Sequence, residues 1–311
     1  MTHAGSQPTL LTELMAAPPV TRLKGVSQAG APALLKRTRS VTRYEHSLGV
    51  MGLARRLGLS QQHQTIALLH DATHSAFSHT LDYLVRNDRE DTHEQHAATL
   101  LADPSLAGLV GGDDLAAVVA AITSKPPWLR VLDAVDYTLR DLLRAGLLQQ
   151  RTAHEVTRSL VTIDDQVCFA TIEAAWTFTM LMVEASTRLY ADQVDLFLHS
   201  ALADLLDRAL DRQVLAPQDI LTADDATVLE RLRRDAHLKL LLGDFVSLHP
   251  SNLRERRDRQ RITSKARLFD PPVRASATEV VPLSELDPTW QRTRDAAQRR
   301  AEHGMTLLTT T

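Results

Sequence analysis

The chain has 311 residues, of which 44% are hydrophobic, so it is long enough to bury a substantial core. A formal net charge of −3 and a pI near 6.5 give no general attraction to nucleic acid or to an anionic membrane. The single cysteine, Cys168, excludes an intramolecular disulfide and a cluster of thiolate metal ligands. No signal-peptide pattern and no apolar run of membrane-spanning length is present, so we expect a cytoplasmic protein without a membrane span.

Apolar residues recur at helical spacing through most of the first 250 residues. This pattern predicts helices over residues 45–57, 61–70, 115–122, 129–148, 171–210 with one break, and 225–242. Asp224 is suited to cap the start of the last helix. After Pro250 the sequence predicts two short β segments, 261–268 and 278–282, and a polar helix, 290–303. We therefore expect an all-α fold over residues 1–250, followed by a small mixed α/β extension over residues 251–311.

The first chemical signal is the pair His70 and Asp71, which ends an apolar run. Adjacent residues on a helix diverge by about 100°, yet both side chains reach an ion placed over their shared edge. An isolated His-Asp pair is more often a polar helix end. Here His74 follows His70 by one turn, and His79 and Asp82 form another pair three residues apart. This density of imidazoles and carboxylates favours a metal site over a plain core.

Two further segments carry residues of the same kinds. Arg43 precedes His46 by three residues, so a guanidinium flanks the imidazole on a continuous helix, which suits a metal-bound phosphate. Taken singly, His46 is better explained as an ordinary core histidine. Farther along, spacings of three and four align a polar stripe that, taken alone, resembles a solvated helix face. The stripe consists of Asp133, Asp136, Tyr137, Arg140 and Asp141.

Together these motifs resemble the HD superfamily, whose pattern is one His, then His-Asp, then a distant Asp around a metal. Four segments carry the resemblance in order: Arg-Tyr-Glu-His-Ser-Leu-Gly-Val at 43–50, Leu-Leu-His-Asp with Phe-Ser-His at 68–79, Thr-His-Glu at 92–94, and Asp-x-x-Asp-Tyr with Arg-Asp at 133–141. The similarity spans residues from about 20 to 150 and is closest to the deoxynucleoside triphosphate triphosphohydrolase branch.

The resemblance implies a role for each matching residue. The implied metal ligands are His46, His70, Asp71 and Asp133. The implied proton-handling group near the scissile phosphate is His74, Asp82 and His93, with Asp82 orienting an imidazole. Arg43 resembles the phosphate-contacting arginine, and Gln28 resembles the glutamine that reads the deoxyribose hydroxyl. The other expected substrate contacts are His79, Tyr137, Asp141 and Tyr190.

We expect one divalent metal ion, and this mixed nitrogen and oxygen set suits manganese, iron, cobalt, nickel, zinc or magnesium equally. Such an ion lowers the pKa of water and offsets charge on phosphoryl oxygens. The expected reaction converts a deoxynucleoside triphosphate to a deoxynucleoside and tripolyphosphate. The alternative is a phosphatase that acts on nucleoside mono- or diphosphates.

Three positions depart from the pattern of that branch. Ala134 replaces the lysine after the last metal-binding aspartate, and Met182 and Gln193 replace basic residues near Tyr190. A triphosphate substrate therefore requires other cations. The candidates are Lys36, Arg37, Arg39, Lys265 and Arg267.

Two rival classes stay open. An HD-fold oxygenase with two irons needs histidines on two further helices, but none lies between His96 and Asp133, so we rank it below hydrolysis. A non-catalytic nucleic-acid-binding or regulatory HD protein is suggested by the arginine-rich stretch 254–261. Glu255 and Asp258 interrupt this stretch and no aromatic residues interleave with it. We therefore expect a nucleotide substrate and no nucleic-acid partner, and leave a homo-oligomer open.

Overall fold

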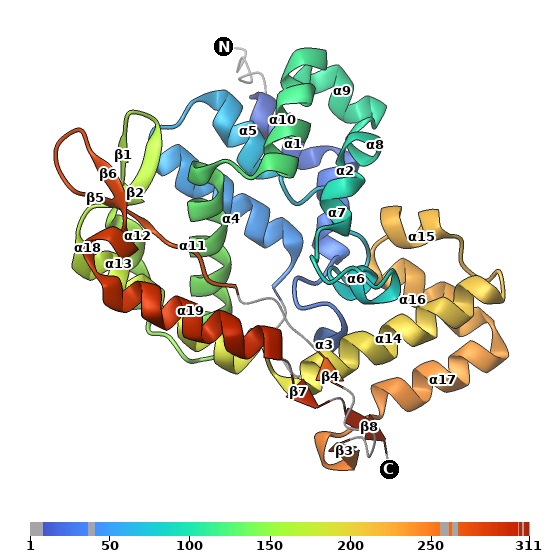
Figure 1. Ribbon diagram of the computed structural model, residues 1–311. Helices are drawn as coiled ribbons and strands as arrows, with labels where there is room; N and C mark the ends of the chain where they lie inside the picture. The colour runs from blue at the N-terminus through green and yellow to red at the C-terminus, as the bar shows by residue number, and fades with distance from the viewer. Residues whose placement is uncertain are drawn as a thin grey trace.

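Helices dominate the computed structural model, which describes residues 9–36, 41–255, 261–262, 267–303, 305–306 and 308–310. These parts of the chain form nineteen α-helices and a few short strands, and 67% of the structure is helical (Figure 1). The predicted helical core is therefore confirmed. The predicted mixed extension after residue 250 is supported in part, because some short strands are present there.

The helices of the first half are α1 (Leu10–Ala16), α2 (Pro18–Thr21), α3 (Ala31–Leu34), α4 (Arg43–Arg56), α5 (Gln61–Leu69), α6 (Thr80–Leu84), α7 (Thr92–Gln95), α8 (Ala97–Leu101), α9 (Pro104–Val110), α10 (Gly112–Ser124), α11 (Pro127–Arg144) and α12 (Gln150–Arg158). Those of the second half are α13 (Ile172–Ala185), α14 (Gln193–Asp211), α15 (Pro217–Thr222), α16 (Asp225–Arg234), α17 (Ala236–Val246), α18 (Leu283–Leu286) and α19 (Pro288–His303). The strands are β1 (Leu160–Ile163), β2 (Gln166–Phe169), β3 (Leu253–Glu255), β4 (Arg261–Ile262), β5 (Pro272–Arg274), β6 (Val280–Pro282), β7 (Met305–Thr306) and β8 (Leu308–Thr310). Shorter turns are the 3-10 helices η1 (Arg22–Gly25) and η3 (Pro250–Asn252), and the π-helix η2 (Ser186–Tyr190).

Local capping fixes where the two central helices begin. Thr42 starts α4 with a capping box, because its hydroxyl accepts from the Glu45 N–H at 3.1 Å and the Glu45 carboxylate accepts from the Thr42 N–H at 2.9 Å. Pro127 occupies the first turn of α11, where its missing N–H costs no intrahelical bond. These helices pack against each other in the middle of the molecule (Figure 1).

Two hydrophobic clusters hold the fold together. One joins α4, α5, α10, α11 and α13, and the other joins α6, α14, α16 and α17. A cavity lies between them, since α11 and α14 both contribute lining residues. The candidate functional side chains line this junction.

The C-terminal segment returns to the first cluster. β5 pairs in parallel with β2, Phe169 lying opposite Val273, and the sheet has the order β1-β2-β5-β6. Val273, Leu283 and Trp290 are buried in the same cluster as α4 and α11. The segment after residue 250 therefore shares its core with the helical part, and α19 runs along the outside (Figure 1).

Two differences between the sequence-based elements and the structure concern residues 225–246 and 160–169. The predicted helix over 225–242 is two helices, because Asp235 adopts an extended conformation and caps α17. Asp224 does cap α16, accepting from the Thr227 N–H at 2.8 Å. The hairpin of β1 and β2 was missed; its turn residues Asp164 and Asp165 both have positive φ. Arg256, Arg257 and Arg259 of the arginine-rich stretch lie outside the described residues.

No single helix in the described ranges is both long and apolar enough to cross a membrane. One pair, Pro104–Val110 with Asp114–Ser124, meets that test only when joined across a bend of 110°.

Candidate active site

The centre of the site is a pair of buried imidazoles on neighbouring helices. His46 lies on α4 and His70 directly follows α5, and their Nε2 atoms are 3.3 Å apart. His46 Nδ1 lies 2.8 Å from the Asp136 carboxylate, and His70 Nδ1 lies 2.8 Å from the carbonyl of Ala67. Both Nδ1 atoms therefore face acceptors. Burial opposes ionisation of His46, but its hydrogen bonds to Asp133 and Asp136 raise its pKa to about 10, so the site stabilises a positive charge on this imidazole.

Two carboxylates complete the donor set. Asp133 Oδ1 lies 3.1 Å from His46 Nε2 and 3.8 Å from His70 Nε2, while Asp71 oxygens lie 3.7 Å and 3.6 Å from the same atoms. His46, His70 and Asp71 are all buried, and their ligand atoms lie within 4.8 Å of one another. Because metal–ligand bonds run about 2.0–2.3 Å, donors around one ion lie about 3–4 Å apart. The residues present therefore fit a divalent metal.

Electrostatics favours a cation at this point. Burial alone would raise the pKa of Asp71, but the Arg43 guanidinium and the nearby imidazoles lower it well below its usual value. Burial opposes ionisation of Asp133 in the same way, and its contacts with His46 and His70 lower its pKa. Two ionised carboxylates thus converge on two imidazoles in a buried space, an arrangement that a positive charge stabilises, whether a bound cation or a proton on His46.

Arg43 stands next to this donor set. Its Nη1 donates to Asp71 Oδ2 at 2.8 Å, and its Nε donates to the Ser78 hydroxyl at 3.0 Å. The Ser78 hydroxyl in turn donates to the carbonyl of Ser27 at 2.6 Å. The guanidinium is buried yet lines the cavity, so the predicted phosphate-contacting arginine lies beside the predicted metal ligands.

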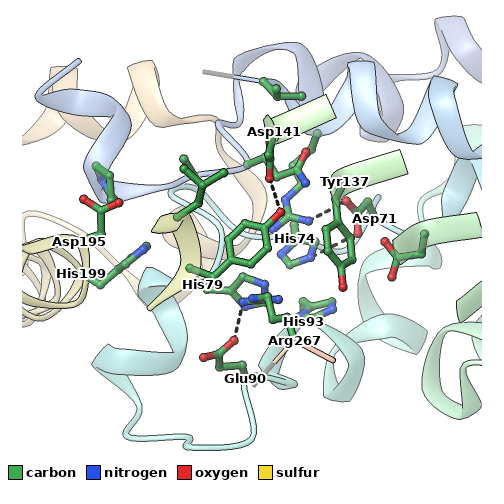
Figure 2. Close-up of a pocket in the computed structure, with 18 of the residues that line it drawn as sticks. Asp71, His74, His79, Glu90, His93, Tyr137, Asp141, Asp195, His199 and Arg267 are labelled. Atoms are coloured by element: carbon green, nitrogen blue, oxygen red, sulfur yellow. Dashed lines mark hydrogen bonds and ion pairs between the residues drawn. The ribbon is translucent and has the colours of Figure 1, made fainter. Parts of the chain in front are cut away.

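Three further histidines form a cluster beyond Asp71. His74 and His93 stack with centroids 3.8 Å apart, and His79 lies 5.1 Å from His74 (Figure 2). Burial and the Arg43 guanidinium lower the pKa of His74 to about 4. Burial, followed by Arg267, lowers the pKa of His79 well below its usual value, and burial and His74 do the same for His93. All three imidazoles are therefore neutral in this structure.

One expected pairing in this cluster differs. Asp82 was expected to orient His74 or His93, but its carboxylate lies 2.9 Å from His79 Nδ1. Its other oxygen accepts from the Thr92 N–H at 3.1 Å. Asp82 lies in the first turn of α6, whose N-cap is His79, and the spacing of three residues directs the two side chains toward each other. His79, predicted as a substrate contact, is thus the histidine that Asp82 contacts.

Three of the predicted nucleoside contacts lie on α11 and η2. Tyr137 of α11 and Tyr190 of η2 meet edge to face with centroids 5.9 Å apart. The Tyr190 hydroxyl donates to Asp141 at 2.9 Å, and burial raises the pKa of this carboxyl to about 6 in spite of that bond. Gln28 lines the cavity, and its Oε1 is buried without a hydrogen-bond partner among the described residues.

The cavity has a volume of about 380 Å³, within the usual size range of ligand pockets. Its lining includes most of the predicted residues and several that sequence reasoning had not selected. The unselected ones are Tyr83, Glu90, Lys125, Arg130, Asp195 and His199. Asp195 and His199 lie one turn apart on α14, a spacing that signals a shared face. The lining also includes Arg267, one of the predicted compensating cations.

The three positions that depart from the family pattern, and the other candidate cations, lie elsewhere. Ala134 and Met182 are buried in the first hydrophobic cluster, and the Gln193 amide donates to the carbonyl of Thr306. Lys36 is exposed and is not among the cavity-lining residues. Arg37, Arg39 and Lys265 lie outside the described residues.

Comparisons with known proteins agree with this geometry. Residues 43–152 match the HD domain. The uncharacterized protein YdhJ of Bacillus subtilis (strain 168) is 32% identical over 261 residues, covering 78% of this chain and 76% of that protein. The metal-dependent phosphohydrolase cns2 of Cordyceps militaris is 32% identical over 192 residues, covering 56% of this chain and 55% of that protein.

The crystal structure of a hypothetical protein from Aquifex aeolicus aligns with a TM-score of 0.68 at 17% identity, over 94% of this chain and 95% of that one. At this identity the likeness concerns the fold alone. On the domain match and the extent of the similarity to YdhJ, the chain belongs to the HD-domain family.

Proposed function

We propose that this protein is a metal-dependent phosphohydrolase that acts on a nucleotide. The observation that carries the proposal is the bond from Arg43 Nη1 to Asp71 Oδ2 at 2.8 Å, beside two imidazole Nε2 atoms 3.3 Å apart. It places a forked phosphate donor against a metal-competent donor set on the wall of one cavity. The relative from Cordyceps militaris bears the name of a metal-dependent phosphohydrolase, which supports the same class.

The proposed metal ligands are His46, His70, Asp71 and Asp133. When bound, a divalent metal supplies Lewis acidity to phosphoryl oxygens and activates water. Arg43 binds the phosphate through the N–H groups that Asp71 and Ser78 do not use.

Proton transfer to the leaving oxygen falls to the histidine cluster. With its Nδ1 hydrogen held by Asp82, His79 has Nε2 available to carry a proton. A bound phosphate anion raises the pKa of a neutral imidazole, and the Asp82 carboxylate stabilises the resulting imidazolium. His74 and His93 lie in the same cluster and stay proposed members of this group.

A deoxynucleoside triphosphate is the first choice of substrate, with tripolyphosphate as product. The unpartnered oxygen of Gln28 supports a sugar hydroxyl donor at the cavity wall, since a buried acceptor without a partner is costly. The edge-to-face rings of Tyr137 and Tyr190, with Asp141 behind them, supply an aromatic wall for a sugar and a base.

One observation favours the alternative substrate, a nucleoside mono- or diphosphate. Several cavity cations already have carboxylate partners, which reduces the positive charge offered to a phosphate chain. The pairs are Lys125 with Glu94 at 2.7 Å, Arg144 with Glu45 at 2.8 Å, and Arg267 with Glu90 at 2.6 Å.

A product-resolved screen separates the two. The purified protein is incubated with ribo- and deoxynucleoside mono-, di- and triphosphates in turn, each with manganese, magnesium, cobalt, nickel, zinc or ferrous iron. Tripolyphosphate from a deoxynucleotide supports the first choice, and orthophosphate alone supports the alternative. Inertness toward every nucleotide in a protein that has bound its metal would refute a nucleotide substrate.

A further inference from the structure

The segment before β5 carries Arg267 into the cavity from outside the region that matches the HD domain. The neighbouring Leu268 and Phe269 pack against the first hydrophobic cluster. The Ser186 hydroxyl, at the start of η2, donates to the carbonyl of Arg267 at 3.5 Å. These contacts fix the backbone, so the guanidinium has a defined place on the cavity wall.

The side chain of Arg267 is held by a carboxylate and an aromatic ring. Its Nη2 lies 2.6 Å from Glu90 Oε2 (Figure 2). Its Cζ lies 5.6 Å from the centroid of the Tyr190 ring. The Arg267 side chain is 26% exposed. Because a guanidinium has five N–H donors in a rigid fork, a bond to one carboxylate leaves donors for a second anion.

Arg267 lines the same cavity as the histidine cluster and the aromatic residues Tyr137 and Tyr190. Its guanidinium lies against the ring of Tyr190. Arg43, the other guanidinium of the cavity, is bonded to Asp71 at the metal centre. Two guanidinium groups at separate places in one cavity suit an anion longer than a single phosphate.

We propose that Arg267 binds the phosphate chain of the substrate beyond the phosphate at the metal centre, and that Glu90 holds the guanidinium until the substrate replaces it. The ligand class is a polyphosphate, whose oxygens match the forked geometry of a guanidinium. This inference rests on the proposed phosphohydrolase function and adds a specificity-determining residue to it.

Calorimetric titration of inorganic tripolyphosphate and of orthophosphate, at one fixed free Mg²⁺ concentration, tests the proposal. The variants are Arg267→Gln, Arg267→Lys and Glu90→Gln. Arg151→Gln is the matched control, because Arg151 forms a surface pair with Glu155 at 2.9 Å and lies away from the cavity lining. Thermal melting of each variant shows whether it is folded.

Arg267→Gln is expected to weaken tripolyphosphate binding about 10- to 100-fold, while orthophosphate binding changes by about threefold or less. Arg267→Lys keeps the charge without the fork and is expected to fall between wild type and Arg267→Gln. Glu90→Gln is expected to tighten tripolyphosphate binding, a gain that a folding defect cannot produce. Arg151→Gln is expected to match wild type.

Unchanged tripolyphosphate binding in Arg267→Gln, or an equal loss for both anions, overturns the proposal. So does a wild-type protein that binds no tripolyphosphate. Failure of the proposed function has a different signature: tripolyphosphate binding still depends on Arg267, but no phosphate ester or anhydride is hydrolysed by the metal-loaded protein.

Discussion

His46 Nδ1 lies 2.8 Å from Asp136 Oδ2, and Arg140 holds the same carboxylate through two N–H groups, at 2.9 Å and 2.6 Å. Asp136 is therefore a positioning residue: it fixes the ring orientation of His46 and directs the Nε2 lone pair at the proposed metal. The sequence placed Asp136 and Arg140 in a polar stripe without assigning them a role.

Asp136→Asn is expected to lower metal affinity about 10- to 100-fold, because carboxylates behind a histidine ligand orient it and raise its basicity. Competition with a graded chelator measures this affinity in a folded variant. The control for metal binding is Arg144→Gln. Arg144 lies on the same helix as Asp136, and its side chain forms an ion pair with Glu45. Wild-type metal affinity in Asp136→Asn would show that His46 needs no such support.

Gly49→Ala is expected to destabilise the fold and weaken metal binding together. A Cβ at Gly49 would overlap the Asp136 carboxylate and the Arg140 guanidinium, so this pair must move. Gly52→Ala, three residues later on α4, is the matched control, since nothing lies within 4 Å of its Cβ. The control is expected to gain about 0.5–1 kcal/mol from reduced backbone entropy. Chemical denaturation measures both, and equal changes would contradict the packing argument.

Asp141→Asn is expected to stabilise the protein more at pH 8 than at pH 5, by about 1 kcal/mol. Burial raises the pKa of Asp141 from 3.8 to about 6, so the native state binds more protons than the unfolded state between these values. Ionisation of Asp141 therefore lowers the free energy of unfolding of the wild type as the pH rises from 3.8 to about 6. Above that range the whole loss of stability persists. Asparagine avoids this penalty and still accepts from the Tyr190 hydroxyl. A pH-independent difference between the two proteins would contradict the shift.

His93→Ala is expected to lower turnover while metal content stays near wild type, since His93 lies in the histidine cluster and its nearest carboxylate contact is Glu94 at 3.7 Å. Asp71→Ala is expected to lower both turnover and metal content. Elemental analysis beside the nucleotide assay separates the two effects. Loss of metal from His93→Ala would make this residue a ligand rather than a proton carrier.

Short ordered motifs selected His46, His70, Asp71 and Asp133 as candidate ligands, and in the structure these four side chains lie close together, from α4, the end of α5 and α11. The same reasoning could not reach the Glu90–Arg267 pair, whose partners are 177 residues apart and carry no local pattern. Asp82 was noticed, but choosing its partner among three histidines requires the turn that places His79 at the start of α6.

In the fold, too, local sequence patterns could be predicted and contacts between distant residues could not. Helical periodicity predicted α4, α5, α10 and α11, because apolar residues recur along each of them at helical spacing. The break at Asp235 was missed because the apolar pattern continues across this residue. In the structure the Asp235 side chain caps α17, and this local capping competes with continuation of the preceding helix. The parallel pairing of β2 with β5 joins Phe169 to Val273 and depends on tertiary contacts alone.

The central claim is that four side chains on three helical segments hold one divalent metal. An anomalous difference map from a crystal soaked in Mn²⁺ tests it most directly. The account predicts one peak per chain, with donor atoms of His46, His70, Asp71 and Asp133 about 2.0–2.3 Å away. A peak elsewhere, or two peaks bridged by Asp71 with further histidine ligands, would contradict it, and the second result would favour a two-metal oxygenase.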